Sequence, residues 1–383
     1  HEGSTPRGKL RAGPPVLDPR AVARALAISA DAASVASGAR GRRIHFVDLL
    51  RLVASFQMIV GHSIDALLAE ELRSGAVYDG WTWVRGLTSV SFMVAAGLSF
   101  HLSTLARFDA HVGDRAKVIA RFRRGGFLML VGYLLHFPAG LFFGDADAAV
   151  REFLIADVLQ CIGLCIVLLE AITVLSRGPR QVVLVSAFLA AVCFVAAPLT
   201  DAIEPAGPLR FALNYLTHRG GSLFPLTPWA GYVFAGVVIG AVALPHGTRT
   251  DARLPLPRLL ACAALVCGLA LLARLGDAPE GVHHNALPGF NLVKLAVVLA
   301  FVALLALAER PIVRLPRRLS ILAGETLTLY AFHLVVLYAG GVGLYRVIGH
   351  ALPLPAAIAV ALSLLAVTCA VALGRHRYKT RRS

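Results

Sequence analysis

Long apolar stretches separated by short basic segments dominate the chain from residue 44 onward. Each stretch is about as long as the roughly 20 residues that an α-helix needs to cross a bilayer. The pattern predicts an all-α bundle of about ten transmembrane helices. The expected spans are residues 44–65, 83–103, 125–143, 152–176, 180–199, 224–244, 258–275, 290–308, 319–339 and 353–374.

The two ends of the chain differ from this apolar region. Residues 1–42 are basic, contain Pro and Gly, and are expected to be disordered. Residues 43–374 are expected to form one transmembrane domain, followed by a basic tail at 375–383. A cleavable signal peptide is not expected, because the first apolar run begins late and carries charges.

The basic residues predict an orientation for the bundle. The 37 Lys and Arg residues are divided unevenly, since 28 of them lie in segments 1–43, 104–124, 177–180, 246–258, 309–318 and 375–383. The intervening segments between spans hold only five. Because Lys and Arg concentrate in cytoplasmic loops, both termini are predicted to be cytoplasmic.

Composition excludes several classes of protein. Hydrophobic residues make up 57% of the chain and charged residues 15%, which is atypical of a soluble domain. The net charge of +15 does not indicate nucleic-acid binding, because the basic residues lie at the ends of apolar runs. All six Cys residues fall within apolar runs without the spacing of a metal site, so no metal is expected.

Two segments on the expected outer side carry polar groups. Residues 200–222, together with 276–289 and its His283 and His284, are either an acceptor-binding surface or ordinary solvated loops. Trp81, Trp83 and Trp229 lie near the expected outer ends of spans, which fits an interfacial aromatic belt.

The first span contains ionisable residues, each of which costs about 2.5–3.5 kcal/mol to insert and therefore suggests a function. Asp48, Arg51, Ser55, Met58 and His62 are separated by three or four residues, so they share one helix face. Arg51 and His62 are about 16 Å apart along the axis. Arg51 is expected towards the cytoplasm and His62 towards the outer half.

This placement favours a reaction whose substrates arrive from opposite sides of the membrane. A neutral His is a suitable general base near pH 7. Arg51 is expected to bind an anionic donor or to pair with Asp48. The alternative is a structural ion pair, with His62 a packed core residue.

Later spans also contain polar residues. Asp157 and Gln160 are either partners for a catalytic imidazole or helix-packing hydrogen bonds. Lys294 is expected to bind an anion rather than to reach out to the interface. In the ninth span, which also contains Glu325, the residues Thr326, Tyr330 and His333 share a face. A second catalytic His, a donor contact and a structural hydrogen bond all remain open for His333.

Four motifs in order resemble the transmembrane acyltransferase superfamily, which includes acyltransferase-3 and heparan-alpha-glucosaminide N-acetyltransferase-like proteins. Arg51, ten residues and His62 are similar to the acyltransferase-3 pattern, and DVLQCIG is similar to the V-L-Q-x-[IL]-G segment of the N-acetyltransferase branch. FPLTPWAG and GETLTLYAFH resemble two further family motifs. Leu52, Thr326 and Cys161 depart from the Gly, Ser and Arg that the family often has there.

The resemblance implies transfer of an acyl group, usually acetyl, from cytoplasmic acyl-CoA to an extracytoplasmic sugar hydroxyl or amine. It places the protein in the bacterial cytoplasmic membrane, with a homodimer left open. His62 would be the general base or the acyl carrier. The candidate site comprises His62 and Asp157 as catalytic residues, Arg51, Asp48 and Lys294 on the donor, and Ser55, Gln160, Glu325, Tyr330 and His333 as lining residues.

A secondary transporter is the alternative function, since intramembrane Asp, Arg and His residues also serve proton-coupled permeases. Such transporters often contain internal repeats. The polar face of the first span has no clear counterpart in the sixth, which disfavours this alternative.

Overall fold

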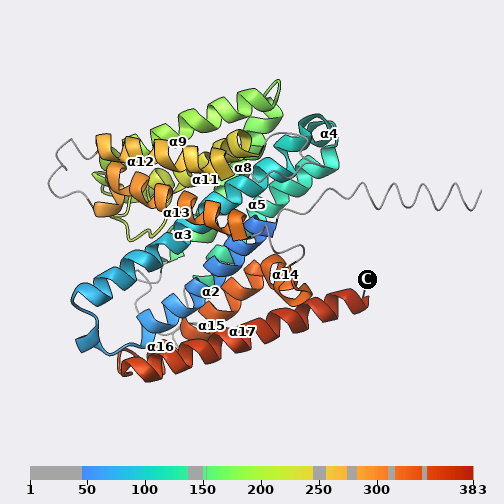
Figure 1. The fold of residues 1–383 in the computed structure, drawn as a ribbon. Coiled ribbons are helices and arrows are strands. Elements are labelled where there is room, and N and C mark those ends of the chain that lie inside the picture. The colour runs from blue at the N-terminus through green and yellow to red at the C-terminus, as the bar shows by residue number, and fades with distance from the viewer. Residues whose placement is uncertain are drawn as a thin grey trace, which may run out of the picture. The chain divides into compact units, whose positions relative to one another are not determined.

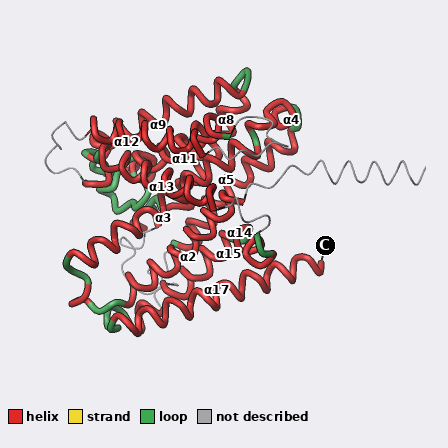
Figure 2. The backbone as a smooth tube through the Cα atoms, in the orientation of Figure 1, coloured by secondary structure: helices red, strands yellow, loops and turns green. Residues whose placement is uncertain are grey.

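The structure, a computed structural model, describes residues 45–136, 150–151, 153–244, 256–273, 283–308, 315–338 and 343–382. The segment 1–42 that was expected to be disordered lies outside these residues. The described chain is helical and contains no strand element (Figure 2). Its longer helices are α2 (His45–Leu67), α3 (Ala76–Ser103), α5 (Arg115–Leu135), α8 (Val158–Leu175), α9 (Pro179–Asp201), α11 (Leu226–Ala243), α12 (Leu256–Ala273), α13 (Pro288–Ala308) and α17 (Leu354–Arg382). Its shorter helices are α4 (Phe108–Val112), α10 (Arg210–Leu213), α14 (Arg317–Gly324), α15 (Thr326–Tyr338), α16 (Leu344–Ile348) and four 3-10 turns, of which η4 (His284–Ala286) matters below.

The expected all-α membrane bundle is confirmed. Among the described residues, eight helices are long and apolar enough to cross a bilayer, and the bent pair α14 and α15 brings the number to nine. These nine correspond in order to nine of the ten expected spans.

The remaining expected span, 125–143, falls on α5. The first half of α5 carries five basic side chains, which lowers its hydropathy below that of a membrane span. Residues 137–143 of the expected span lie outside the described residues. The described part of the chain therefore supports nine spans and leaves the tenth a prediction.

The ninth span is broken, whereas the sequence predicted one continuous helix over 319–339. Helix α14 ends before Glu325, and α15 leaves it at an angle of 71°. The Glu325 carboxylate accepts hydrogen bonds from Arg375, at 2.5 Å, and from Lys379, at 3.1 Å, both on α17. These ion pairs tie the bend to the last helix, a contact that helical periodicity cannot show.

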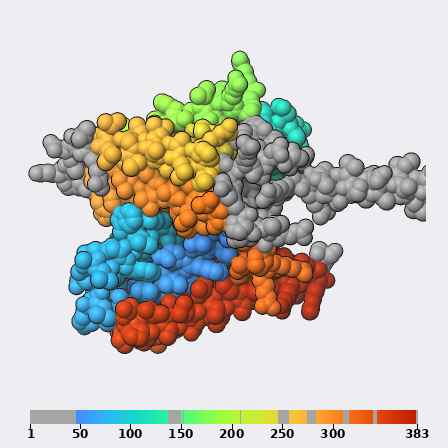
Figure 3. All heavy atoms as spheres, viewed as in Figure 1, coloured from blue at the N-terminus to red at the C-terminus, as the bar shows by residue number. Residues whose placement is uncertain are grey.

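The helices form two groups with separate apolar cores (Figure 1). The first group contains α2, α14, α15, α16 and α17, and its core includes Ile59, Leu67 and Leu329. The second contains α3, α5, α8, α9, α11, α12 and α13. Helix α2 contributes Leu50 and Met58 to the second core, so it joins the groups. In the space-filling view, α17 (red) runs along the surface beside α2 (blue) (Figure 3).

Glycines allow the closest helix crossings of the second group. A Cβ at Gly97 of α3 would lie 2.0 Å from the Val233 carbonyl oxygen of α11. A Cβ at Gly125 of α5 would lie 2.8 Å from the carbonyl oxygen of Gly163 on α8. Small residues permit such backbone contact, which stabilises helix pairs where lipid provides no hydrophobic drive.

Helices α3 and α17 run antiparallel to α2, and with it they define two ends of the bundle. Helix α3 returns along α2, because Arg85 pairs with Asp65 near the end of α2, and Arg51 donates to Ser99 near its beginning. Helix α17 also returns, since the Ala69 amide bonds the Leu352 carbonyl near the end of α2. The bundle thus has one end where α2 begins and another where α2 ends.

Candidate active site

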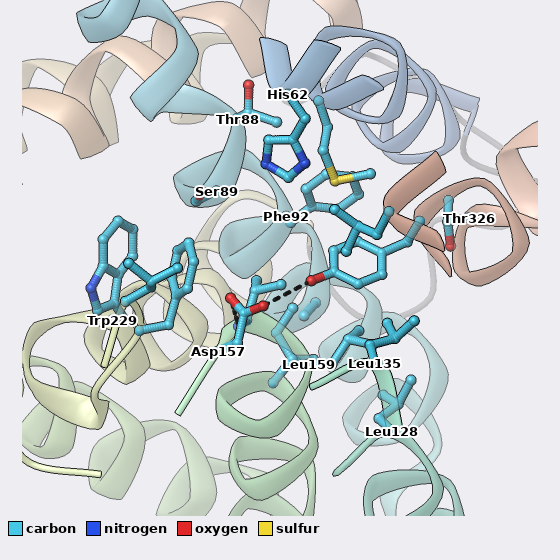
Figure 4. A pocket seen from close by; sticks show the side chains of 18 of the residues that line it. His62, Thr88, Ser89, Phe92, Leu128, Leu135, Asp157, Leu159, Trp229 and Thr326 are labelled. Carbon is cyan, nitrogen blue, oxygen red and sulfur yellow. Dashed lines mark hydrogen bonds between the residues drawn. The ribbon is translucent and has the colours of Figure 1, made fainter. Parts of the chain in front are cut away.

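A cavity of about 2390 Å³ lies between the two helix groups. At the end where α2 begins, it is lined by Arg121 and Arg124 of α5 and by Arg375 and Lys379 of α17; we call this the basic end. At the end where α2 ends, it is lined by His218, His283 and His284; we call this the histidine end. His62 lines the cavity between them, and its ring points into the space in Figure 4.

Hydrogen bonds determine which nitrogen of His62 is available to react. His333 Nδ1 lies 2.7 Å from the Leu329 carbonyl oxygen, so Nδ1 must carry the proton and donate it. In a neutral His333, Nε2 is then an acceptor, and it lies 3.1 Å from His62 Nδ1. His62 therefore donates from Nδ1 and keeps a lone pair on Nε2. His333 is fully buried behind His62 and positions it, without lining the cavity itself.

Asp157 also lines the cavity, at the N-cap of α8 (Figure 4). One carboxylate oxygen accepts from the Val158 amide at 2.7 Å, and the other accepts from the Tyr330 hydroxyl at 3.3 Å. His136 Nε2 lies 3.5 Å from the same second oxygen. Asp157 thus joins α8 to α15 and to the end of α5. Its hydrogen bond orients the Tyr330 side chain, which also lines the cavity.

Arg51 lines the cavity nearer the basic end, as the stripe on α2 predicted. Its guanidinium donates to the Ser99 hydroxyl at 2.8 Å. Ser55 does not line the cavity, because it is fully buried and its hydroxyl bonds the Arg51 carbonyl oxygen. Asp48 is buried outside the lining as well. Only part of the predicted polar face of α2 therefore lines the cavity.

Of the two expected lining residues Gln160 and Glu325, only Glu325 lines the cavity. Gln160 is fully buried against α5, where a Cβ at Gly132 would lie 2.4 Å from its amide oxygen, and it does not line the cavity. It packs α8 on α5. Glu325 does line the cavity, at the basic end, with its carboxylate bound by Arg375 and Lys379.

Lys294 lines the cavity near the histidine end, away from Arg51. Its ammonium donates to Asn285 at 2.9 Å and lies 4.3 Å from the centre of the Phe290 ring. It also lies 5.9 Å from the Trp229 ring centre. Only 4% of Lys294 is exposed. Lys294 thus lies at the other end of the cavity from Arg51, with which it was grouped as a donor contact.

Trp229 differs from the interfacial role that its position in the sequence suggested. It is 5% exposed and lines the cavity opposite His62 in Figure 4. The FPLTPW segment turns the chain into α11 here, so the indole faces inward. Sequence reasoning also missed Asp201 and His218, which hydrogen bond at 3.1 Å across 17 residues. The only signal for them was the outer segment 200–222.

The sequence profile described as heparan-alpha-glucosaminide N-acetyltransferase, catalytic, matches residues 43–273. That range covers more than half of the chain and includes α2 with Arg51 and His62. The chain belongs to this family. Among curated proteins, none matches the chain.

Membership of the heparan-alpha-glucosaminide N-acetyltransferase family confirms the resemblance and identifies the chain as a membrane acetyltransferase rather than a transporter. The match ends before α13, so Lys294, Glu325, Tyr330 and His333 lie beyond it. The described residues contain no group of three or more His, Cys, Asp or Glu side chains able to hold a metal ion.

Proposed function

We propose that this acetyltransferase takes an acetyl group from acetyl-CoA bound at the basic end and gives it to an amine, or secondarily a hydroxyl, of a sugar that enters at the histidine end. The observation that carries the proposal is the single cavity that joins the two ends, with the free Nε2 of His62 inside it. By the distribution of Lys and Arg, the basic end faces the cytoplasm of a bacterial cell.

The charges at the basic end suit a polyanionic donor. Five cations line that half of the cavity, namely Arg51, Arg121, Arg124, Arg375 and Lys379. Arg and Lys form charge-assisted hydrogen bonds with phosphate oxygens, and Arg does so with two donors at once. We expect the CoA nucleotide to bind here, with its pantetheine arm reaching past Arg51 towards His62.

The chemistry at His62 needs the lone pair that His333 leaves on Nε2. If His62 is a general base, Nε2 takes the N–H proton of the acceptor amine as the C–N bond forms and the C–S bond of the thioester breaks. The proton then passes to the CoA thiolate, which leaves as the thiol. If His62 is an acyl carrier, Nε2 attacks the thioester first, the C–S bond breaks and CoA leaves as the thiolate. The amine then takes the acetyl group from Nε2, and its N–H proton passes to the CoA thiolate.

The test uses purified protein in lipid, labelled acetyl-CoA and glucosamine. We expect His62→Ala to reduce label transfer at least a hundredfold, as removal of a general base or nucleophile does. His350→Ala is the control, because His350 bonds Glu70 outside the cavity and should retain transfer. Full transfer by folded His62→Ala protein would refute the assignment. A burst of free CoA before glucosamine is added identifies a carrier, whereas a base releases CoA only when the acceptor is present.

A further inference from the structure

A second ordered imidazole lines the cavity at the histidine end. His218 Nδ1 lies 3.1 Å from Asp201 Oδ1, and both residues are largely buried. The carboxylate can only accept, so His218 Nδ1 donates and its Nε2 keeps a lone pair. His218 is thus a second imidazole with a fixed tautomer. It has no role in the acetyl-transfer mechanism proposed for His62.

Several contacts hold the Asp201 carboxylate in place. Its other oxygen accepts from the His283 amide at 3.1 Å. Arg219 donates through Nε to the Asp201 carbonyl oxygen and through Nη1 to Glu204, both at 2.6 Å. The His218 ring stacks on His283 with centroids 5.1 Å apart. The loop after α9, the loop before α11 and η4 therefore meet at this carboxylate.

The free nitrogen of His218 lies beside an aromatic surface. The Trp229 indole N–H is 3.5 Å from His218 Nε2, the limit of a weak hydrogen bond that an incoming donor can replace. Both residues line the cavity. An indole face is suited to the apolar side of a sugar ring, which would bring the polar substituents of that sugar to His218.

Burial, more than the surrounding charges, favours the neutral form of His218. Burial lowers the pKa of His218, and this effect outweighs the opposing influence of Asp201. His283 and His284 lower it further. Two cations lie near this imidazole. Arg219, the next residue in the chain, contacts Asp201, and the Lys294 ammonium lies over the ring of Trp229. A neutral imidazole at pH 7 is able to accept a proton.

An amine acceptor presents a proton problem that such a base solves. An amine with a pKa of about 8, like an α-amino group, is mostly protonated at pH 7 and has no lone pair for attack. Two protons must leave its nitrogen in total, one before attack and one as the amide forms. His62 accounts for the second only.

We propose that His218, oriented by Asp201, is an acceptor-side base that removes the first proton from the ammonium group of an amino-sugar substrate at the histidine end. This inference rests on the proposed acetyl transfer. The ammonium gives H⁺ to His218 Nε2, and the resulting imidazolium is paired with Asp201 and releases its proton to solvent. The neutral amine then attacks the acetyl carbon, and CoA leaves as before. The nearby Lys294 charge also favours the neutral amine by repelling the ammonium form.

The experiment compares two acceptors in the lipid-reconstituted protein. Glucosamine needs deprotonation, whereas methoxyamine is already neutral at pH 7. For His218→Gln, we expect kcat/KM for glucosamine to fall about tenfold at pH 7, because about a tenth of an amine with a pKa of about 8 is already neutral there and needs no base. The loss should shrink as pH rises through the pKa of the amine, and the rate with methoxyamine should stay within a few-fold of wild type. Asp201→Asn should show the same pattern more weakly.

Matched controls distinguish this role from a structural one. His283→Gln keeps the backbone hydrogen bond to Asp201, so it should change kcat/KM for the two acceptors by the same factor. Equal loss with both acceptors in His218→Gln, independent of pH, would overturn the proposal, as would no loss with glucosamine. If His218→Gln does not fold, Asp201→Asn gives the same comparison. Failure of wild-type protein to acetylate either amine would instead refute the proposed function.

Discussion

The two ends of the cavity differ in the kind of charge that they present. The basic end is lined by Arg and Lys side chains on α5 and α17, which remain cationic at any physiological pH. The histidine end is lined by imidazoles and aromatic rings, together with Lys294 and with Arg85, which pairs with Asp65. Burial lowers the pKa of His218 and His284 there. One end suits a permanent polyanion and the other a group that exchanges protons. This difference is the basis of the direction of transfer that we propose.

The largest expected effect on activity comes from removing the hydrogen bond that orients His62, which lies between the two ends of the cavity. In His333→Leu, nothing accepts from His62 Nδ1, so the tautomer with a free Nε2 is no longer favoured. We expect kcat to fall about a hundredfold or more. Acetyl transfer to glucosamine with saturating acetyl-CoA measures it.

His333→Gln provides the matched control for this prediction. Its side-chain carbonyl oxygen can accept from His62 in place of the imidazole, so a substantial part of the activity should return. Equal activity in the Leu and Gln variants, with both proteins folded, would show that His333 only fills space.

The next prediction concerns the stability of the close packing between α5 and α8. Helix α5 brings Arg121 and Arg124 to the basic end, and it packs on α8, whose N-cap is Asp157. In Gly125→Ala, the new methyl group would lie 2.8 Å from the Gly163 carbonyl oxygen. We expect a loss of about 1–3 kcal/mol in stability, as overpacking costs. Thermal unfolding in detergent should show a lower midpoint.

Gly126 is the neighbouring control on the same helix. A Cβ there would meet nothing within 4 Å, and Ala is the better helix former, so Gly126→Ala should match or exceed wild-type stability. The same loss in both variants would contradict the close crossing.

A smaller expected effect concerns the difference between two acetyl donors. We expect Arg375→Gln to raise the KM for acetyl-CoA about tenfold, because a charge-assisted hydrogen bond contributes about 1.5–3 kcal/mol. The KM for acetyl-pantetheine, which lacks the nucleotide, should not change. Glu325→Gln should shift the acetyl-CoA value in the opposite direction, since it releases Arg375 and Lys379.

Arg377 is the control, two residues further along α17, exposed and outside the cavity lining. Arg377→Gln should leave both donors unaffected. If Arg375→Gln weakens acetyl-pantetheine as much as acetyl-CoA, the nucleotide does not bind at the basic end.

Much of this fold could be predicted from the sequence, because membrane helices need long apolar runs and their ends carry basic residues. The stripe on α2 was also readable, since Arg51 and His62 belong to one helix and periodicity alone places them on one face. Both line the cavity. Local patterns within one helix thus pointed to two residues of the cavity wall.

Contacts between distant segments could not be predicted in this way. His333 lies 271 residues from His62, and its role depends on a hydrogen bond that only packing creates. Asp201 and His218 meet through the ends of α9 and α11. Trp229 turned out to be buried because the segment before α11 turns inward, which hydropathy does not report.

The smallest expected effect tests the contrast between the ends without any mutation. Salt screens exposed charges over about 8–10 Å, so it should weaken attraction of the CoA phosphates by the basic end. Between low and high NaCl, we expect the KM for acetyl-CoA to rise a few-fold. The values for acetyl-pantetheine and methoxyamine should stay nearly constant, because neither is charged. A parallel rise for all three would mean that salt acts on the bundle as a whole. A rise for acetyl-CoA alone, abolished in Arg375→Gln, would assign the attraction to that end of the cavity.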